Sequence, residues 1–284
     1  MRVAMPDDNP RSEDGIDVRS ITVGRQVLRV AIKRGAKDRP PLLLFNGIGA
    51  NWELTKPFLH AMKKTEVIIF DIPGVGGSPL PSRPYRPSAI AGLAAKLVTQ
   101  LGYDKVDVAG VSWGGGAAQQ FAFQHRSLCR RLVLAATSPG AIMVPGRLSV
   151  IWKLATPRRY IDKDYLNNIA GEIYGGAFRN DQTLAAHHAG GMSGVRGMGY
   201  FYQLIAMAGW SSLPWLWSLK QPTLVMMGTD DPIVPPTNGK FLSWMIPNSQ
   251  LVFIDDGHLF MITRPMESAG IVERFLSKDD HNNQ

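Results

Sequence analysis

Ser112 has the clearest chemical signature in this sequence, because it is the central residue of a Gly-Val-Ser-Trp-Gly motif at positions 110–114. The motif follows a strand-like run, residues 106–109, and opens a helix-like run. In that context a G-x-S-x-G motif forms a sharp strand-to-helix turn that exposes the serine hydroxyl, and its glycines let neighbouring backbone pack closely. A chance match is the alternative in a chain with 29 glycines. The position directly after a strand favours a nucleophile.

A serine hydroxyl attacks efficiently only when a base takes its proton, and in this arrangement the chain order is Ser, then acid, then His. His258 is the one histidine that lies in a loop after a late strand-like run, residues 250–255. The others fall on predicted helices, in an insertion or in the C-terminal tail: His60, His125, His187, His188 and His281. We therefore predict that His258 is the general base.

Two adjacent aspartates, Asp230 and Asp231, follow another apolar strand-like run and could orient the histidine. Asp231 precedes Pro232, and a residue before proline is held extended, which turns its side chain out of the strand end. We therefore favour Asp231 as the acid of the triad. Asp255 and Asp256 lie so close in sequence to the histidine that a local turn-capping role is the better interpretation for them.

An ester-cleaving serine also needs two donors preorganised where the oxyanion develops. The backbone N–H of Trp113, directly after the nucleophile, is one candidate, and the second should come from the glycine-rich loop at residues 45–51. Within that loop the N–H of Ile48 is the best choice. Asn46 could hydrogen-bond within the loop, act as a turn residue or contact the substrate.

The glycine-rich stretch at residues 71–78 lacks the GK[ST] ending and the GxGxxG spacing of phosphate-binding loops, so a structural turn is the better interpretation. No group of His, Asp and Glu has the spacing of a metal site. We therefore expect neither a metal nor a cofactor.

Short strand-like runs alternate with helix-like runs, which predicts an α/β protein with a mostly parallel sheet and helices on both faces. The expected strands are residues 20–24, 27–33, 41–46, 66–71, 105–111, 131–136, 222–228 and 250–255, and the expected helices are residues 54–63, 88–102, 113–125, 236–245 and 265–276. The second helix has an apolar stripe with Ser88 at the N-cap position and Gly102 at the C-terminal stop.

The alternation stops between residues 139 and 221, a segment rich in Trp, Tyr, Met and Gly with mixed helical patterning. We interpret it as a helical cap inserted into a core formed by residues 18–138 and 222–277. Residues 1–17 are polar and lack periodicity, as does the C-terminal end, which predicts disordered tails.

The chain of 284 residues carries 31 Lys and Arg against 23 Asp and Glu, a formal net charge of +8. With 45% apolar and 19% charged residues it has the composition of a globular protein. The basic residues are scattered in pairs such as Arg130 and Arg131, so nucleic-acid binding is not expected. The single cysteine, Cys129, excludes an internal disulfide and favours a reducing compartment.

The N-terminal residues 1–15 lack the apolar stretch of a secretory signal, so export is not expected. The most apolar long segment, residues 204–219, is interrupted by Ser211, Ser212 and Pro214 and is shorter than the roughly 20 residues of a membrane span. We therefore expect no transmembrane segment.

Beyond these motifs, several segments resemble the intracellular depolymerases of medium-chain-length polyhydroxyalkanoates, which have the α/β-hydrolase fold. The resemblance runs from about residue 18 to residue 276. The segments that carry it are FNGIGANWEL, FDIPGVGGSPLPSRPYR, GVSWGGGAAQQFA, LVLAAT, MVPG, TPRRYI, IYGGAFR, QPTLVMMGTDDPIVP and IDDGHLFMITR.

The resemblance implies that Ser112 is the nucleophile, Asp231 the acid and His258 the base, the same residues that the motifs select. It also implies an enzyme of the cytoplasm that acts on storage-polyester granules, releases 3-hydroxyalkanoic acid units and uses no cofactor. Two alternatives are a carboxylesterase or C–C bond hydrolase of small soluble substrates, and a non-enzymatic granule-surface protein. A complete Ser, Asp and His set argues against the second.

Trp210, Trp215 and Trp217 lie within one short stretch near the end of the insertion. Exposed apolar patches usually mark binding surfaces. One hypothesis is that at least one of these tryptophans is exposed and contacts the polymer, and the alternative is that all three are buried in the cap.

Overall fold

The computed structural model describes residues 14–155, 158, 162–191 and 197–278, and its centre is an eight-stranded sheet. The strands are β1 (Ile16–Val23), β2 (Gln26–Lys33), β3 (Leu42–Phe45), β4 (Val67–Phe70), β5 (Val106–Val111), β6 (Cys129–Ala135), β7 (Thr223–Gly228) and β8 (Ser249–Ile254). Their spatial order is β1-β2-β4-β3-β5-β6-β7-β8. The β1–β2 and β2–β4 pairs are antiparallel and the other pairs are parallel, which confirms the predicted mostly parallel sheet.

The first strand begins at Ile16, inside the segment expected to be a disordered tail and four residues before the predicted start of the strand. Ile16 is fully buried and pairs with Lys33 of β2. Its neighbours Asp17 and Arg19 bond to each other, 2.6 Å apart. These two polar residues hide the strand pattern from the sequence, although Ile16 belongs to one core of the sheet and Ile21 and Val23 belong to the other. The expected tail over residues 1–13 lies outside the described residues.

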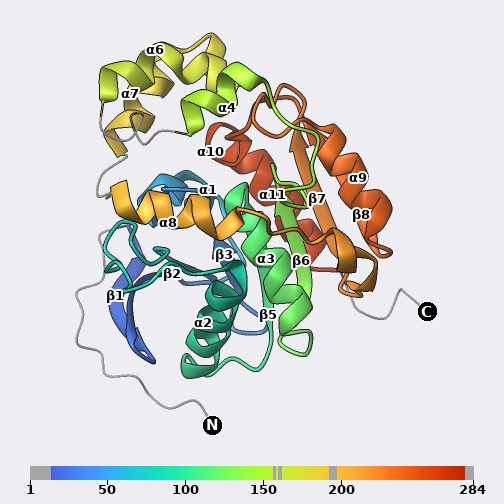
Figure 1. Cartoon of the computed structure of the whole chain (residues 1–284). Coiled ribbons are helices and arrows are strands. Elements are labelled where there is room, and N and C mark those ends of the chain that lie inside the picture. Colours follow the sequence, from blue (N-terminus) through green and yellow to red (C-terminus); the bar gives the residue numbers. More distant parts are fainter. Residues whose placement is uncertain (1–13, 156–157, 159–161, 192–196, 279–284) are drawn as a thin grey trace.

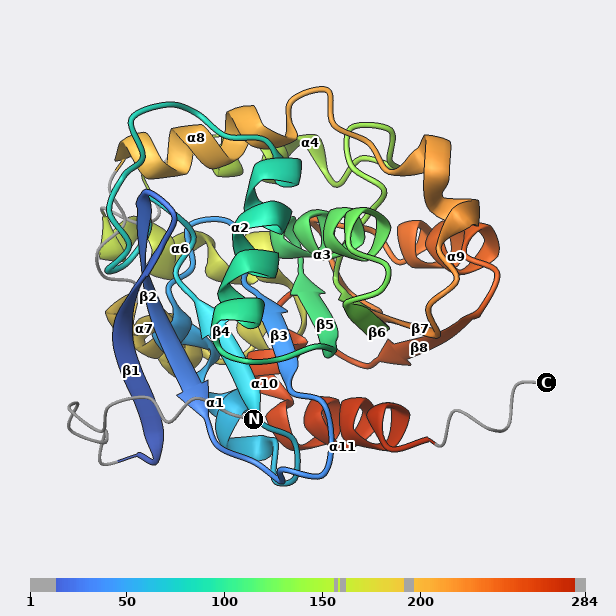
Figure 2. The same cartoon turned by 90° about the horizontal axis from the view of Figure 1, so that it is seen from below.

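The central strands are buried on both faces, as parallel strands between two helical layers should be. Alternate residues of β3 therefore belong to different cores: Leu43 and Phe45 pack with the helices on one face, and Leu42 and Leu44 with those on the other. The first face is covered by α2 (Pro87–Gln100), α3 (Trp113–Gln124) and α9 (Thr237–Met245), and the second by α1 (Lys56–Ala61), α10 (Phe260–Thr263) and α11 (Pro265–Leu276). Figures 1 and 2 show α2 and α3 on the side of the sheet opposite to α11.

Two predicted helix boundaries are wrong for reasons that involve proline. Ser88 is not the N-cap of α2, because the helix begins at Pro87, whose fixed φ and missing N–H suit the first helical position. Gly102 follows the end of this helix with φ +86°, as a C-terminal stop should. The helix expected over residues 54–63 is instead a 3₁₀ turn, η1 (Trp52–Thr55), followed by α1. Proline is tolerated only in the first turn of a helix, and Pro57 is the second residue of α1.

The segment between β6 and β7 is helical and forms the cap. Its elements are α4 (Leu148–Leu154), α6 (Lys163–Tyr174), η2 (Gly176–Arg179), α7 (Gln182–Gly191), α8 (Gly197–Met207) and η3 (Leu213–Ser218). Figure 1 shows α4, α6 and α7 grouped at the top of the molecule, with α8 running across it below them. Val150, Leu166 and Ile173 form a small cap core with Leu54 of η1, which attaches the cap to the sheet domain.

The two ends of the cap meet. Gly140 and Ser211 form an isolated antiparallel bridge, the N–H of Ser212 donates to the carbonyl of Pro139 at 2.9 Å, and the N–H of Ala141 donates to the carbonyl of Trp210 at 2.8 Å. We call residues 139–141 and 210–212 the neck. Within the part of the chain that the structure describes, each helix is too short or too polar to cross a bilayer.

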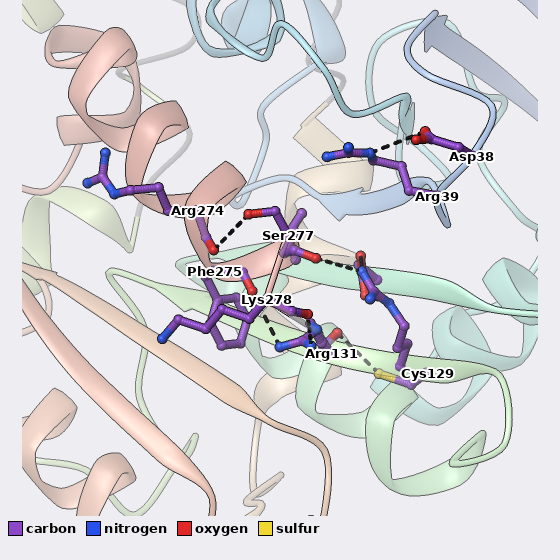
Figure 3. Close-up of polar contacts among 11 residues, drawn as sticks. Asp38, Arg39, Cys129, Arg131, Arg274, Phe275, Ser277 and Lys278 are labelled. Atoms are coloured by element: carbon purple, nitrogen blue, oxygen red, sulfur yellow. Dashed lines mark hydrogen bonds and ion pairs between the residues drawn. The ribbon is translucent and has the colours of Figure 1, made fainter. Parts of the chain in front are cut away.

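Two arginines of β6 attach the last helix to the sheet. Arg131 donates to the carbonyls of Phe275 and Lys278, at 3.3 and 2.5 Å (Figure 3). Arg130 donates to the carbonyl of Leu276 at 3.0 Å. The last carbonyls of a helix have no intrahelical partners and carry partial negative charge. The arginines therefore satisfy and neutralise the C-terminal end of α11.

Candidate active site

Ser112 sits on the turn between β5 and α3 with φ +54° and ψ −119°, a conformation that a non-glycine residue adopts only under constraint. Its N–H donates to the carbonyl of Ala135 at 2.9 Å. Its own carbonyl accepts a hydrogen bond from the Thr137 hydroxyl at 2.7 Å. Ala135 is the last residue of β6 and Thr137 follows shortly after it, so the end of β6 holds the strained turn in place.

Gly110 and Gly114 are required by close backbone contacts on either side of the nucleophile. A Cβ on Gly110 would lie 2.3 Å from the carbonyl oxygen of Gly114, and a Cβ on Gly114 would lie 2.2 Å from the carbonyl oxygen of Phe45. Heavy atoms do not approach that closely without a shift of the backbone. The glycines therefore let the turn pack against the end of β3, where the oxyanion loop begins.

His258 and Asp231 form a buried pair. His258 Nδ1 lies 2.7 Å from Asp231 Oδ2, and both side chains are almost fully buried. The other carboxylate oxygen of Asp231 accepts from the N–H groups of Ile233 and Val234, each at 2.9 Å. A carboxylate fixed in this way holds the imidazole with a proton on Nδ1, which leaves Nε2 to act as the base.

Asp230 has a different task, although it is the neighbour of Asp231. Its carboxylate pairs with Arg179 at 2.6 Å and accepts from the N–H of Gly176 at 2.8 Å. The hydrogen bond from Arg179 holds the pKa of Asp230 below its usual range. Asp256 likewise accepts from the N–H of Ala177 at 2.8 Å. These two aspartates attach η2 of the cap to the loops of the sheet domain.

Ser112 and His258 line one cavity of about 90 Å³, together with Asn46 and Ile48. Their side chains form no direct hydrogen bond to each other in this structure, and such bonds often tighten only when substrate is bound. Most of the remaining wall is apolar and comes from the sheet domain and the cap: Val111, Leu154, Tyr174, Ile233, Leu259, Met261 and Ile262. His188 completes the wall and packs edge-on against the Tyr174 ring, a position that its helical pattern does not reveal.

Asn46 lines this cavity, but its amide is used within the loop. The side-chain NH₂ donates to the carbonyl of Asn51 at 2.7 Å and to the hydroxyl of Thr55 at 2.9 Å, and its oxygen accepts from the N–H of Gly47 at 2.9 Å. These bonds fix the loop that carries Ile48, and contact of Asn46 with the substrate stays a prediction.

Gln203 on α8 touches both arms of the candidate oxyanion hole, and the sequence gives no sign of it. Its side-chain oxygen accepts from the N–H of Gly49 at 2.7 Å, and its carbonyl accepts from the indole N–H of Trp113 at 2.8 Å. The residue is fully buried. Trp113 opens α3, so its backbone N–H is among those without an intrahelical acceptor, and Ile48 precedes Gly49. One cap residue thus fixes the position of both loops.

The three cap tryptophans have separate environments. Trp217 is exposed over 61% of its surface. The Trp215 ring stacks on Phe123 with centroids 4.4 Å apart, and the indole N–H of Trp210 donates to Gln120 at 2.9 Å. The expectation that at least one of them is exposed is confirmed for Trp217, and its contact with polymer stays a prediction.

The glycine-rich loop after β4 is organised by Asp71, a fully buried carboxylate. It accepts from the N–H groups of Trp52 and Gly77, each at 2.8 Å. Burial raises the pKa of Asp71 to about 6. A Cβ on Gly76 would lie 2.2 Å from this carboxylate, so the glycine makes room for it. In the described ranges, no three His, Cys, Asp or Glu side chains are grouped as metal ligands would be.

Comparison with known proteins agrees with this geometry. A family model of the alpha/beta hydrolase fold matches residues 40–265. The chain is 49% identical over 262 residues to poly(3-hydroxyalkanoate) depolymerase of Ectopseudomonas oleovorans, covering 92% of this chain and 93% of that protein. It is 28% identical over 282 residues to 2-hydroxymuconate semialdehyde hydrolase of Pseudomonas sp. strain CF600, covering 91% of this chain and 95% of that protein.

Solved structures share the fold at lower identity. The enol-lactonase from Burkholderia xenovorans LB400 superposes with a TM-score of 0.80 and 22% identity, covering 92% of this chain and all of that one. A thermophilic esterase from Thermogutta terrifontis gives 0.74 and 24%, covering 92% and 98%. At these identities the likeness establishes the architecture alone.

Proposed function

The chain belongs to the alpha/beta hydrolase family, among the poly(3-hydroxyalkanoate) depolymerases, and from that premise we propose that it hydrolyses medium-chain-length poly(3-hydroxyalkanoate) to 3-hydroxyalkanoic acid units. The observation that carries the proposal is the buried hydrogen bond between Asp231 and His258, because His258 lines the same cavity as Ser112. That arrangement supplies a nucleophile, a base and an orienting acid at one point.

In the proposed reaction His258 Nε2 takes the hydroxyl proton of Ser112 as Oγ bonds to the ester carbonyl carbon. The backbone N–H groups of Trp113 and Ile48 stabilise the negative oxygen that forms. The bond to the alkoxide oxygen then breaks, and His258 gives its proton to that oxygen. Water repeats the sequence on the acyl-enzyme, with His258 again as the base, and releases the acid. In this scheme Ser112, His258, Asp231 and the two backbone N–H groups supply every group that acts on the ester, and no step uses a cofactor or a metal.

The medium-chain assignment is supported by the apolar wall of the catalytic cavity. Leu154, Ile233 and Leu259 come from three separate segments and leave a surface suited to alkyl groups. An alkyl side chain transferred from water to such a surface gains about 0.8 kcal/mol per buried methylene. A polar or very short side chain would leave this surface without a partner.

The proposal includes adsorption to granules of the polymer in the cytoplasm. Five exposed large apolar side chains come from one segment of the cap, which we call the α4 patch: Ile142, Val144, Leu148, Ile151 and Trp152. The same segment supplies Leu154 to the catalytic cavity. The segment that carries the α4 patch thus also contributes to the cavity of Ser112, and exposed apolar side chains of this kind usually mark a binding surface.

Incubation with a latex of medium-chain polyester tests the proposal directly. We expect 3-hydroxyalkanoic acids among the products with the natural protein and none with Ser112→Ala, because the covalent step needs the hydroxyl. Loss of a triad member costs several orders of magnitude in rate. An intact latex, with small esters still hydrolysed, would overturn the polymer assignment.

A second candidate is hydrolysis of C–C bonds in small soluble substrates, which the 28% identity to 2-hydroxymuconate semialdehyde hydrolase favours. A meta-cleavage product offered under the same conditions distinguishes the two. Turnover of that compound without release of 3-hydroxyacids from latex would make the C–C hydrolase the better assignment.

A further inference from the structure

A second cavity reaches Ser112 from another side. Its volume is about 280 Å³, against about 90 Å³ for the cavity described above. Ser112 lines both cavities, whereas His258 lines only the first. Ser112 is therefore shared by the walls of two cavities, and His258 belongs to the wall of only one of them.

The side chains that line the second cavity are mostly apolar. Ala141, Met143, Met207, Trp210 and Val234 supply most of it. The hydroxyl and indole groups in this wall already have partners within the protein. Thr137 donates to the carbonyl of Ser112, the Ser138 hydroxyl contacts the sulfur of Met143, and the Trp210 indole donates to Gln120. The cavity thus suits an alkyl group and offers little to a charged one.

The neck builds this cavity and fixes its shape. Ala141 and Trp210 are joined by a backbone hydrogen bond of 2.8 Å. Gly140 has φ +97°, and a Cβ there would lie 2.5 Å from the carbonyl oxygen of Trp210. The two strands of the neck therefore approach so closely that only glycine fits at position 140, which holds Ala141 and Trp210 of the cavity wall in fixed positions.

The reaction determines which part of an ester enters each cavity. The alkoxide leaving group must take its proton from His258, so the alcohol side of the ester lies next to that residue. The first cavity contains His258 and the second does not. The acyl side is then left to the second cavity.

We propose that the cavity bounded by Met207, Trp210 and Ala141 is the acyl subsite, which holds the alkyl side chain of the unit that becomes the acyl-enzyme. The first cavity holds the alcohol-side unit. The choice of a hydroxyalkanoate polymer as substrate rests on the proposed function, but the assignment of acyl and alcohol sides applies to any ester that Ser112 cleaves.

Two variants change the second cavity in opposite directions. Ala141→Leu narrows it, and the exposure of Ala141 leaves room for the larger side chain without repacking a core. Met207→Ala widens it. Met198→Ala is the matched control, because Met198 lies on the same helix but is exposed over 51% of its surface and lines neither cavity. Melting temperatures show whether each variant is folded.

The substrates are two ester series that lengthen on one side only. In p-nitrophenyl esters from acetyl to decanoyl the alcohol is constant, and in alkyl acetates from methyl to octyl the acyl group is constant. We expect Ala141→Leu to lower kcat/KM for long acyl groups about tenfold relative to acetyl, a typical effect of methylene-sized changes in an apolar pocket. Met207→Ala should shift the preference to longer acyl groups. The alkyl acetates and the control variant should change less than about twofold.

A change confined to the alkyl acetates would reverse the assignment, and unchanged profiles in both series would show that the second cavity binds no part of the substrate. Neither result depends on polymer. Failure of the polymer assignment appears instead as an intact latex with the natural protein, so the two failures are distinguishable.

Discussion

At the scale of single residues, the sharpest prediction concerns the adjacent Asp230 and Asp231, which bond to different partners. Asp231→Asn should lose most esterase activity, by about three to four orders of magnitude in kcat, because the amide holds His258 in the wrong tautomer. Asp230→Asn should retain most activity, because Asp230 bonds to Arg179 and Gly176 and not to the histidine. Steady-state kinetics on a p-nitrophenyl ester checks the pair, and a reversed order of the two losses would refute the triad assignment.

Asp71 gives a prediction about pH. Burial raises the pKa of this carboxyl to about 6 in the folded protein, against 3.8 as its ordinary value. Between those pH values the folded state binds more protons than the unfolded state, so the free energy of unfolding falls as pH rises. The stabilising contribution is complete below about pH 4 and is lost above about pH 6.

Asp71→Asn lacks this ionisation, so its stability relative to the natural protein should improve as pH rises from about 4 to 7. The expected change is on the order of 2 to 3 kcal/mol. Urea denaturation at both pH values measures it. If the difference in the free energy of unfolding between Asp71→Asn and the natural protein is the same at both pH values, Asp71 does not titrate in this range.

At the scale of elements, helix α8 contacts both arms of the candidate oxyanion hole through Gln203. Gln203→Met keeps the volume but removes the acceptor for the N–H of Gly49, while the backbone bond to Trp113 remains possible. We expect kcat to fall about tenfold to a hundredfold with KM little changed, since loss of an oxyanion donor outright costs 10² to 10³.

Affinity for a boronic acid that mimics the tetrahedral intermediate should fall in parallel with kcat. Gln124→Met, at the exposed end of α3, controls for the substitution itself. A lower melting temperature with unchanged kcat and boronate affinity would limit Gln203 to a structural role.

The α4 patch and Trp217 are the two proposed sites of contact with the polymer surface. Trp152 is 75% exposed on α4, and Trp217 is 61% exposed on η3. If the α4 patch binds polymer, Trp152→Ala should reduce binding to polymer latex about tenfold, the effect of losing one large apolar contact. Hydrolysis of soluble esters and the melting temperature should not change.

Trp244→Ala is the matched control, because Trp244 is 77% exposed on α9, outside the patch. Trp217→Ala tests the alternative contact in the same sedimentation assay. Trp215→Ala, which removes a ring stacked on Phe123, should instead cost about 3 to 5 kcal/mol of stability. If Trp152→Ala, Trp217→Ala and the natural protein bind latex equally well, adsorption through these side chains is excluded.

For the molecule as a whole, local patterns were enough to predict the sheet and to identify the residues of the candidate triad. The turn at Ser112 depends on glycines two positions away, and a central strand such as β3 has four apolar residues in succession. Such signals depend on residues that are close together in the chain, so they can be recognised in a single sequence.

What could not be predicted depends on partners distant in the chain. Gln203 bonds to a residue 154 positions away, and nothing near it in sequence differs from an ordinary helix. Ile16 is buried only because β2 pairs with it. The two cavities at Ser112 likewise exist only because the cap is folded onto the sheet domain.

The neck also has an evolutionary consequence. Because the chain leaves the sheet domain and returns to it at two points held together by backbone hydrogen bonds, the cap is an insert whose replacement need not disturb β6, β7 or the residues they carry. Its junction, however, forms a wall of the second cavity. Recombination at the neck would therefore exchange acyl specificity together with the cap and leave Ser112, Asp231 and His258 in place, but a new cap would have to replace the support that Gln203 gives to the loops of Gly49 and Trp113.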